Sequence, residues 1–156
     1  MSDEELAGLV KRIHQELAEL QRVLDRTQEG WELFRRSNDD LYLDSVALNL
    51  HGLYSGFERL FTHIAETIDG KLPQGAEWHK LLLEQMKTEI PGIRPAVIST
   101  ETGKFLDELR RFRHIVRNVY THHIDPERLK KLVDGSFKSF AQLSAEISAF
   151  AAFLEQ

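Results

Sequence analysis

The chain has 156 residues, of which 42% are hydrophobic, and its 25 Asp/Glu against 20 Lys/Arg give a net charge of −5. This length predicts one globular domain over residues 1–156. The absence of cysteine excludes disulfides, thiolate metal ligands and a cysteine nucleophile, while an acidic N-terminus without a long apolar run predicts a cytoplasmic protein with no membrane span.

Two long amphipathic helices are predicted in the first half of the chain. Leucine and isoleucine recur at steps of three and four over residues 3–26, and this pattern can be extended through Trp31 to Phe34. Residues 37–40 then offer capping side chains for a second long helix, whose apolar stripe runs from Val46 to Ile68. Gly52 and Gly56 lie one turn apart in that helix. A helical glycine costs about 1 kcal/mol relative to alanine, so both predict close approach of another helix.

Turn residues interrupt the middle of the chain. Asp69-Gly70 and Pro73-Gln74-Gly75 end the second helix, and Pro91-Gly92 and Pro95 follow about twenty residues later. The apolar-rich segment between these breaks, residues 76–86, predicts one short helix.

Two further long helices complete the chain. Ser99-Thr100-Glu101 has the capping chemistry of a helix start, and Asp125-Pro126-Glu127 combines an N-cap, a proline at the first helical position and a favourable charge. His122, His123 and Ile124 are then the turn between these helices. The aromatic residues are expected in the core: Phe57, Phe61, Phe105, Phe112, Phe137 and Phe140. The fold class is therefore predicted as all-α, an up-and-down bundle of four long helices plus a short inserted helix.

A basic cluster distinguishes the third long helix from the rest of the chain. Eight Lys/Arg stand against four Asp/Glu between Lys104 and Lys131, so the remainder is strongly acidic. At about 100° per residue, one helix face carries Arg110, Arg113, Arg117 and Tyr120, with His114 at its flank. This strip is either a solvated face whose arginines pair with nearby carboxylates, or a binding surface for phosphate.

A histidine follows the strip and suggests chemistry beyond binding. Arg117 lies near the predicted helix end and His122 five residues later, where a turn could bring the two together. Histidine can exchange a proton near neutral pH, arginine can hold a phosphate oxygen with two hydrogen bonds, and Asn118 can orient a ligand. His14, His51, His63 and His79 are scattered without metal-binding spacing, so neither a metal site nor a cofactor is predicted.

The segment Arg117-Asn118-x-x-x-His122 near the end of a late helix resembles the signature of the HEPN superfamily. Residues 112–120 and 125–129 around it are similar to HepT-like proteins. The resemblance implies a metal-independent endoribonuclease toxin that works as a homodimer on RNA, beside a nucleotidyltransferase antitoxin of the MNT type. Cleavage would proceed by attack of the RNA 2′-OH and leave a 2′,3′-cyclic phosphate.

On this resemblance Arg117 and His122 would be catalytic, and Asn118, Arg113 and His114 would support phosphate binding. Position 124 is Ile where HepT proteins carry a tyrosine that the antitoxin adenylylates, so Tyr120 is the possible substitute. His123 and His114 are alternatives to His122 as the acting histidine. The alternative function is a non-catalytic HEPN-like module that binds a nucleotidyltransferase partner or nucleotide phosphates.

Overall fold

The computed structural model describes residues 2–118 and 124–156, and within these ranges it forms helices and no strand. The elements, in order, are α1 (Asp3–Ser37), α2 (Leu41–Ile64), the π-helical turn η1 (Ala65–Asp69), α3 (Trp78–Lys87), α4 (Thr100–Asn118) and α5 (Pro126–Leu154). This is the all-α arrangement predicted from the sequence, with four long helices and a short one inserted between the second and third.

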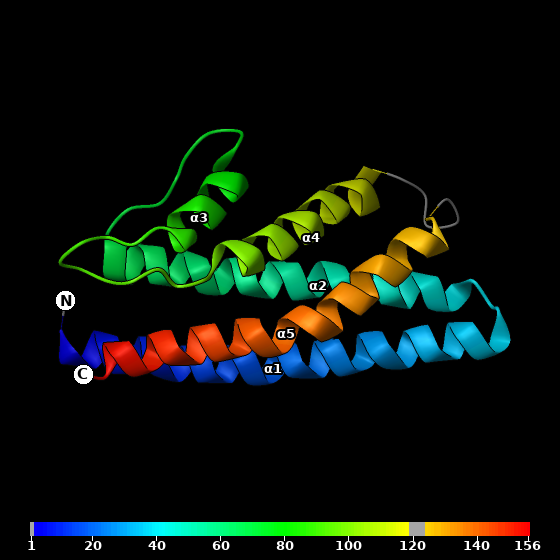
Figure 1. Ribbon diagram of the computed structural model, residues 1–156, viewed down its shortest axis with the longest axis horizontal. Helices are drawn as coiled ribbons and strands as arrows, with labels where there is room; N and C mark the ends of the chain where they lie inside the picture. The colour runs from blue at the N-terminus through cyan, green and yellow to red at the C-terminus, as the bar shows by residue number, and fades with distance from the viewer. Residues whose placement is uncertain (1, 119–123) are drawn as a thin grey trace.

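The long helices α1 and α2 run antiparallel and form the base of the bundle (Figure 1). The C-terminal half of α5 lies along α1, so that the two chain ends come to the same end of the molecule. Helix α4 crosses α2, and α3 packs against both of them. One hydrophobic cluster draws side chains from all five α-helices, and Phe57, Leu60 and Phe61 of α2 are among its most deeply buried members.

Local capping chemistry sets the helix starts. Ser2 and Glu5 form a reciprocal capping box at α1, and the Leu41 amide at the start of α2 donates to Asp39 Oδ1 at 3.0 Å. At α4 the Thr102 amide donates to Ser99 Oγ at 3.1 Å. Asp125 accepts a hydrogen bond from the Glu127 amide, with Pro126 in the first helical position of α5. Side chains that satisfy first-turn amides favour a helix start at these positions.

The packing predictions for Gly56 and for five of the six core aromatic residues are confirmed, whereas those for Gly52 and Phe137 prove wrong. A Cβ atom on Gly56 would collide with the buried Leu20 side chain of α1, which confirms a close helix approach there. A Cβ on Gly52 would meet nothing, because that side of α2 faces open space. Phe137 is 45% exposed, not buried, because α5 turns the neighbouring Ser136 and Phe140 into the core instead.

A buried ion pair anchors the segment that carries α3. Arg94 binds Asp69, the last residue of η1, through Nε–Oδ1 at 2.6 Å and Nη2–Oδ2 at 2.8 Å, and both side chains are fully buried. Arg94 also donates to the backbone carbonyls of Gln85, Thr88 and Pro95. These bonds tie the loop after α3 to the end of α2 and so fix the position of α3. Across the described helices, none is long and apolar enough to cross a membrane.

Candidate functional site

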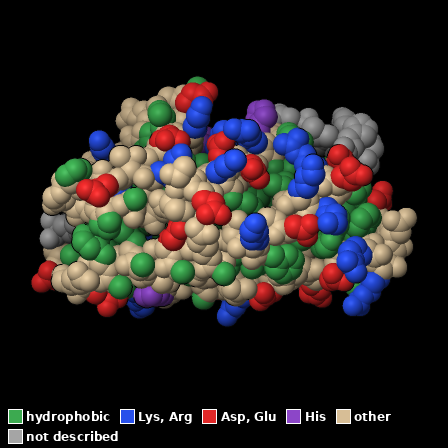
Figure 2. Space-filling model, viewed as in Figure 1, with side chains coloured by type: hydrophobic (Ala, Val, Ile, Leu, Met, Phe, Trp, Pro, Cys, Tyr) green, Lys and Arg blue, Asp and Glu red, His purple; other side chains and the backbone are tan. Residues whose placement is uncertain are grey.

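The basic strip of α4 lines a cavity of about 610 Å³ between α3 and α4. Arg110, Arg113, His114 and Arg117 form one wall of this cavity, which we call the arginine cavity. The opposite wall comes from α3 and the residues just before it: Ala76, Glu77, His79 and Lys80. In Figure 2, Lys and Arg side chains gather over the part of the surface that α4 forms, with Asp and Glu among them. The predicted convergence of the arginines on one face is therefore observed.

The arginines of the strip differ in their partners. Asp107 binds both Arg110 and Arg111, each at 2.8 Å, so part of the local positive charge is neutralised within α4. Within residues 2–118 and 124–156, Arg113 and Arg117 form no ion pair with a carboxylate. The solvated-face interpretation thus fits Arg110 and Arg111, whereas the positive charge of Arg113 and Arg117 faces the cavity.

Helix α2 supports the strip from behind through His51. Arg113 Nε donates a hydrogen bond to His51 Nε2 at 3.2 Å. Burial, followed by the charges of Arg113 and Arg117, lowers the pKa of His51 below 6.5, while Glu58 partly opposes this. An acceptor nitrogen facing a guanidinium must be unprotonated, so the neutral imidazole fixes the direction of Arg113.

His79 reaches the cavity from α3 and is held by a residue of α2. His79 Nδ1 lies 2.5 Å from Glu58 Oε2, and the Trp78 ring packs against the imidazole with centroids 3.7 Å apart. Glu58 is also next to Tyr54, whose pKa is raised by burial and by that carboxylate. The α2 residues His51, Tyr54 and Glu58 thus form a polar row beneath the α3 and α4 walls.

The sequence analysis did not assign His51, Glu58, His79 or Lys80 to the site. A signal existed for part of this set, because residues 51, 54 and 58 follow helical spacing beside the apolar stripe of α2. His79 carried no comparable signal, since its carboxylate partner is 21 residues away in the chain.

The described residues include only part of the predicted site. Arg110, Arg113, His114 and Arg117 are brought together, and Asn118 is the last residue of α4. Tyr120, His122 and His123 lie outside the described residues, so the predicted pair of Arg117 and His122 stays a prediction.

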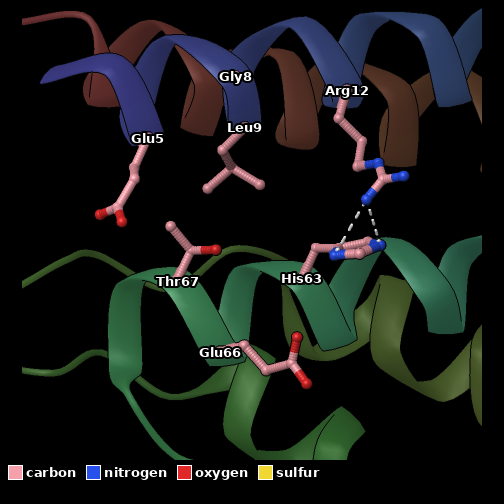
Figure 3. Close-up of a pocket in the computed structure, with 7 residues that line it drawn as sticks. All are labelled: Glu5, Gly8, Leu9, Arg12, His63, Glu66 and Thr67. Atoms are coloured by element: carbon pink, nitrogen blue, oxygen red, sulfur yellow. Dashed lines mark hydrogen bonds between the residues drawn. The ribbon is translucent and has the colours of Figure 1, made fainter. Parts of the chain in front are cut away.

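Another cavity, of about 570 Å³, lies between α1 on one side and the end of α2 with η1 on the other, and its charges differ from those of the arginine cavity (Figure 3). Arg12 Nη1 lies 2.7 Å from His63 Nε2, and burial followed by Arg12 lowers the pKa of His63. Glu5 and Glu66 also line this cavity, so its charges are mixed and it lacks the excess of cations found between α3 and α4. In the described parts of the chain, no group of three or more acidic or histidine side chains could hold a metal ion.

An all-helical bundle that presents several arginines and His114 of a late helix at one cavity is consistent with a HEPN-type domain. A family model described as "HepT-like protein" matches residues 45–154, from the first turns of α2 to the end of α5. The chain therefore belongs to the HepT-like family. Neither the comparison with curated proteins nor that with solved structures finds a match.

Proposed function

We propose that this protein is the endoribonuclease toxin of a toxin–antitoxin pair and cleaves RNA without a metal ion. The observation that carries the proposal is the arginine cavity, where Arg113 and Arg117 face the opening beside His79, His114 and Lys80. A guanidinium can bind a phosphate with two parallel hydrogen bonds, and it keeps its charge at every physiological pH. Family membership supports the same assignment.

In the proposed reaction the RNA 2′-oxygen attacks its own phosphorus, and the bond from phosphorus to the 5′-oxygen breaks. Arg117 stabilises the charge that develops on the non-bridging oxygens, and His122 takes the proton from the 2′-OH. Arg113, kept in place by neutral His51, binds the phosphate, with His114, Arg110 and Asn118 in support. The products are a 2′,3′-cyclic phosphate and a 5′-hydroxyl.

The biological assembly in this proposal is a homodimer that pairs with a nucleotidyltransferase antitoxin. Two copies of the arginine strip around one cleft would double the local positive charge. This would offset the net charge of −5, which otherwise disfavours RNA binding. Tyr120 is the proposed target if the antitoxin acts by adenylylation.

An RNA cleavage assay tests the proposal. Purified protein is incubated with tRNA and with a structured RNA in the presence of EDTA, beside the variants Arg117→Ala, His122→Ala and His114→Ala. We expect wild type to leave 2′,3′-cyclic ends, and Arg117→Ala to lower the rate about 10²–10³-fold, as for loss of one charge-stabilising donor.

The matched control is Arg22→Ala, which removes an exposed arginine of α1. Intact RNA after incubation with wild type, or cleavage that survives Arg117→Ala, would contradict the ribonuclease assignment. RNA or nucleotide binding without cleavage would instead favour the non-catalytic module.

A further inference from the structure

Cleavage of RNA by its own 2′-OH needs two proton transfers. One group must take the proton of the 2′-OH, and another must give a proton to the 5′-oxygen as it leaves. Arginine cannot serve in either role because it does not lose its proton in proteins. The sequence after Arg117 contains two adjacent histidines, His122 and His123, and the proposed function uses His122 as the base. A proton donor on the other side of the phosphate is still required.

The pair of Glu58 and His79 has the geometry of an oriented proton donor. The Glu58 side chain is 12% exposed and its Oε2 lies 2.5 Å from His79 Nδ1, while the His79 side chain is 28% exposed. A carboxylate on one ring nitrogen fixes the tautomer and the orientation of the imidazole. The Trp78 ring restrains the imidazole from one face. The bond uses Nδ1, so Nε2 is the nitrogen left for a ligand.

The position of His79 matches the requirement for a group opposite the arginines. His79 lines the arginine cavity from α3, whereas Arg113 and Arg117 line it from α4. A phosphate bound by the arginines would therefore have His79 across the cavity from the helix that carries the Arg117 motif. His51 cannot fill this role, because its Nε2 accepts a hydrogen bond from Arg113 and its pKa is lowered by burial and by the arginines.

We infer that His79, oriented by Glu58, donates the proton to the leaving 5′-oxygen. This inference rests on the proposed ribonuclease function and adds a catalytic residue to it. As the 2′-oxygen bonds to phosphorus and the bond from phosphorus to the 5′-oxygen breaks, the Nε2 proton of His79 moves to that oxygen. Glu58 is a positioning residue that acts through the imidazole.

A substrate with a sulfur atom in place of the bridging 5′-oxygen tests this assignment directly. A thiolate is a good leaving group without protonation, so it removes the need for a proton donor. For the ordinary RNA, His79→Gln is expected to lower the cleavage rate about 10²–10⁴-fold, the usual contribution of general acid catalysis. For the 5′-thio substrate, the same variant should cleave at nearly the wild-type rate. Glu58→Gln should show a smaller loss with the same rescue.

The controls separate this inference from the proposed function. His63→Gln, in the cavity of Figure 3, should match wild type on both substrates. Arg117→Ala should be slow on both, because its role lies on the non-bridging oxygens. Circular dichroism confirms that each variant keeps its helical content.

The outcomes distinguish the two claims. If wild type cleaves the ordinary RNA and His79→Gln cleaves it equally fast, His79 is not the donor although the ribonuclease assignment stands. The same holds if a folded His79→Gln stays equally slow on the 5′-thio substrate. If wild type cleaves neither substrate, the proposed function fails and this inference fails with it.

Discussion

At the scale of single residues, the arginines and histidines show which features of the site the sequence can predict and which it cannot. The arginine strip could be predicted because Arg110, Arg113 and Arg117 follow helical spacing within one element. The surroundings of His51 and His79 could not, because each depends on a partner from another helix. Identical side chains thus become an acceptor for an arginine in one case and a partner of a carboxylate in the other.

The pH dependence of stability is a residue-scale prediction for His63. Burial and then Arg12 lower its pKa in the folded protein below 6.5. The unfolded chain therefore binds more protons as the pH falls below about 6.5, so the free energy of unfolding decreases there. The contribution is fully present above that pH. One proton of difference changes the free energy by at most about 1.4 kcal/mol per pH unit.

Urea unfolding of wild type and His63→Gln between pH 5 and 8 measures this contribution. We expect wild type to lose stability more steeply below pH 6.5 than the variant does. His14→Gln, which changes an exposed histidine of α1, is measured beside it for comparison. Equal slopes for wild type and His63→Gln would refute the assignment.

At the scale of elements, the helix starts could be predicted where a nearby side chain caps the first turn. The starts of α4 and α5 follow from Ser99 and Asp125, whose side chains cap their first turns. The π-helical turn at Ala65–Asp69 was not predicted, because the apolar spacing through Ile64 and Ile68 fits a continuous α-helix. The sequence also could not predict that α1 packs closely against Gly56 and leaves open space at Gly52, because both glycines have the same local setting in α2.

These two glycines form a matched pair for a helix-scale prediction. Gly52→Ala should raise the free energy of unfolding by about 0.5–1 kcal/mol, because the added methyl meets nothing and alanine favours the helix. Gly56→Ala should lower it by about 1–3 kcal/mol, because Leu20 must move within a packed core.

Chemical denaturation of both variants under one set of conditions gives the two changes. Effects of the same sign and size would mean that α1 does not approach α2 at Gly56 as described.

At the scale of the whole molecule, the arginine cavity depends on a contact outside it. Helix α3 forms one cavity wall, and the pair of Arg94 and Asp69 holds the loop that follows α3 against the end of α2. The sequence indicated only a loop rich in proline and glycine here. Nothing local shows that Arg94, alone among the arginines of the described chain, lies fully buried. The number and order of helices were predictable, but the anchoring of the loop was not.

Arg94→Ala should lower the free energy of unfolding by about 3–5 kcal/mol, because it leaves a buried carboxylate without its cation. Lys130→Ala breaks an exposed pair with Asp134 and should change stability by no more than about 1 kcal/mol. Urea titration followed by circular dichroism compares the two. A loss for Arg94→Ala as small as that for Lys130→Ala would mean that this pair does not secure the loop.

The uneven distribution of charge also affects the direction from which a charged partner would associate. Most of the chain is acidic, while cations are concentrated in and around one helix. A polyanion approaching from a random direction is repelled by the acidic surface and attracted near α4, so the field of the protein orients the encounter before contact. Association would then slow steeply as ionic strength rises, because screening shortens the range of that field. An acidic protein can in this way direct a polyanion to a small part of its surface.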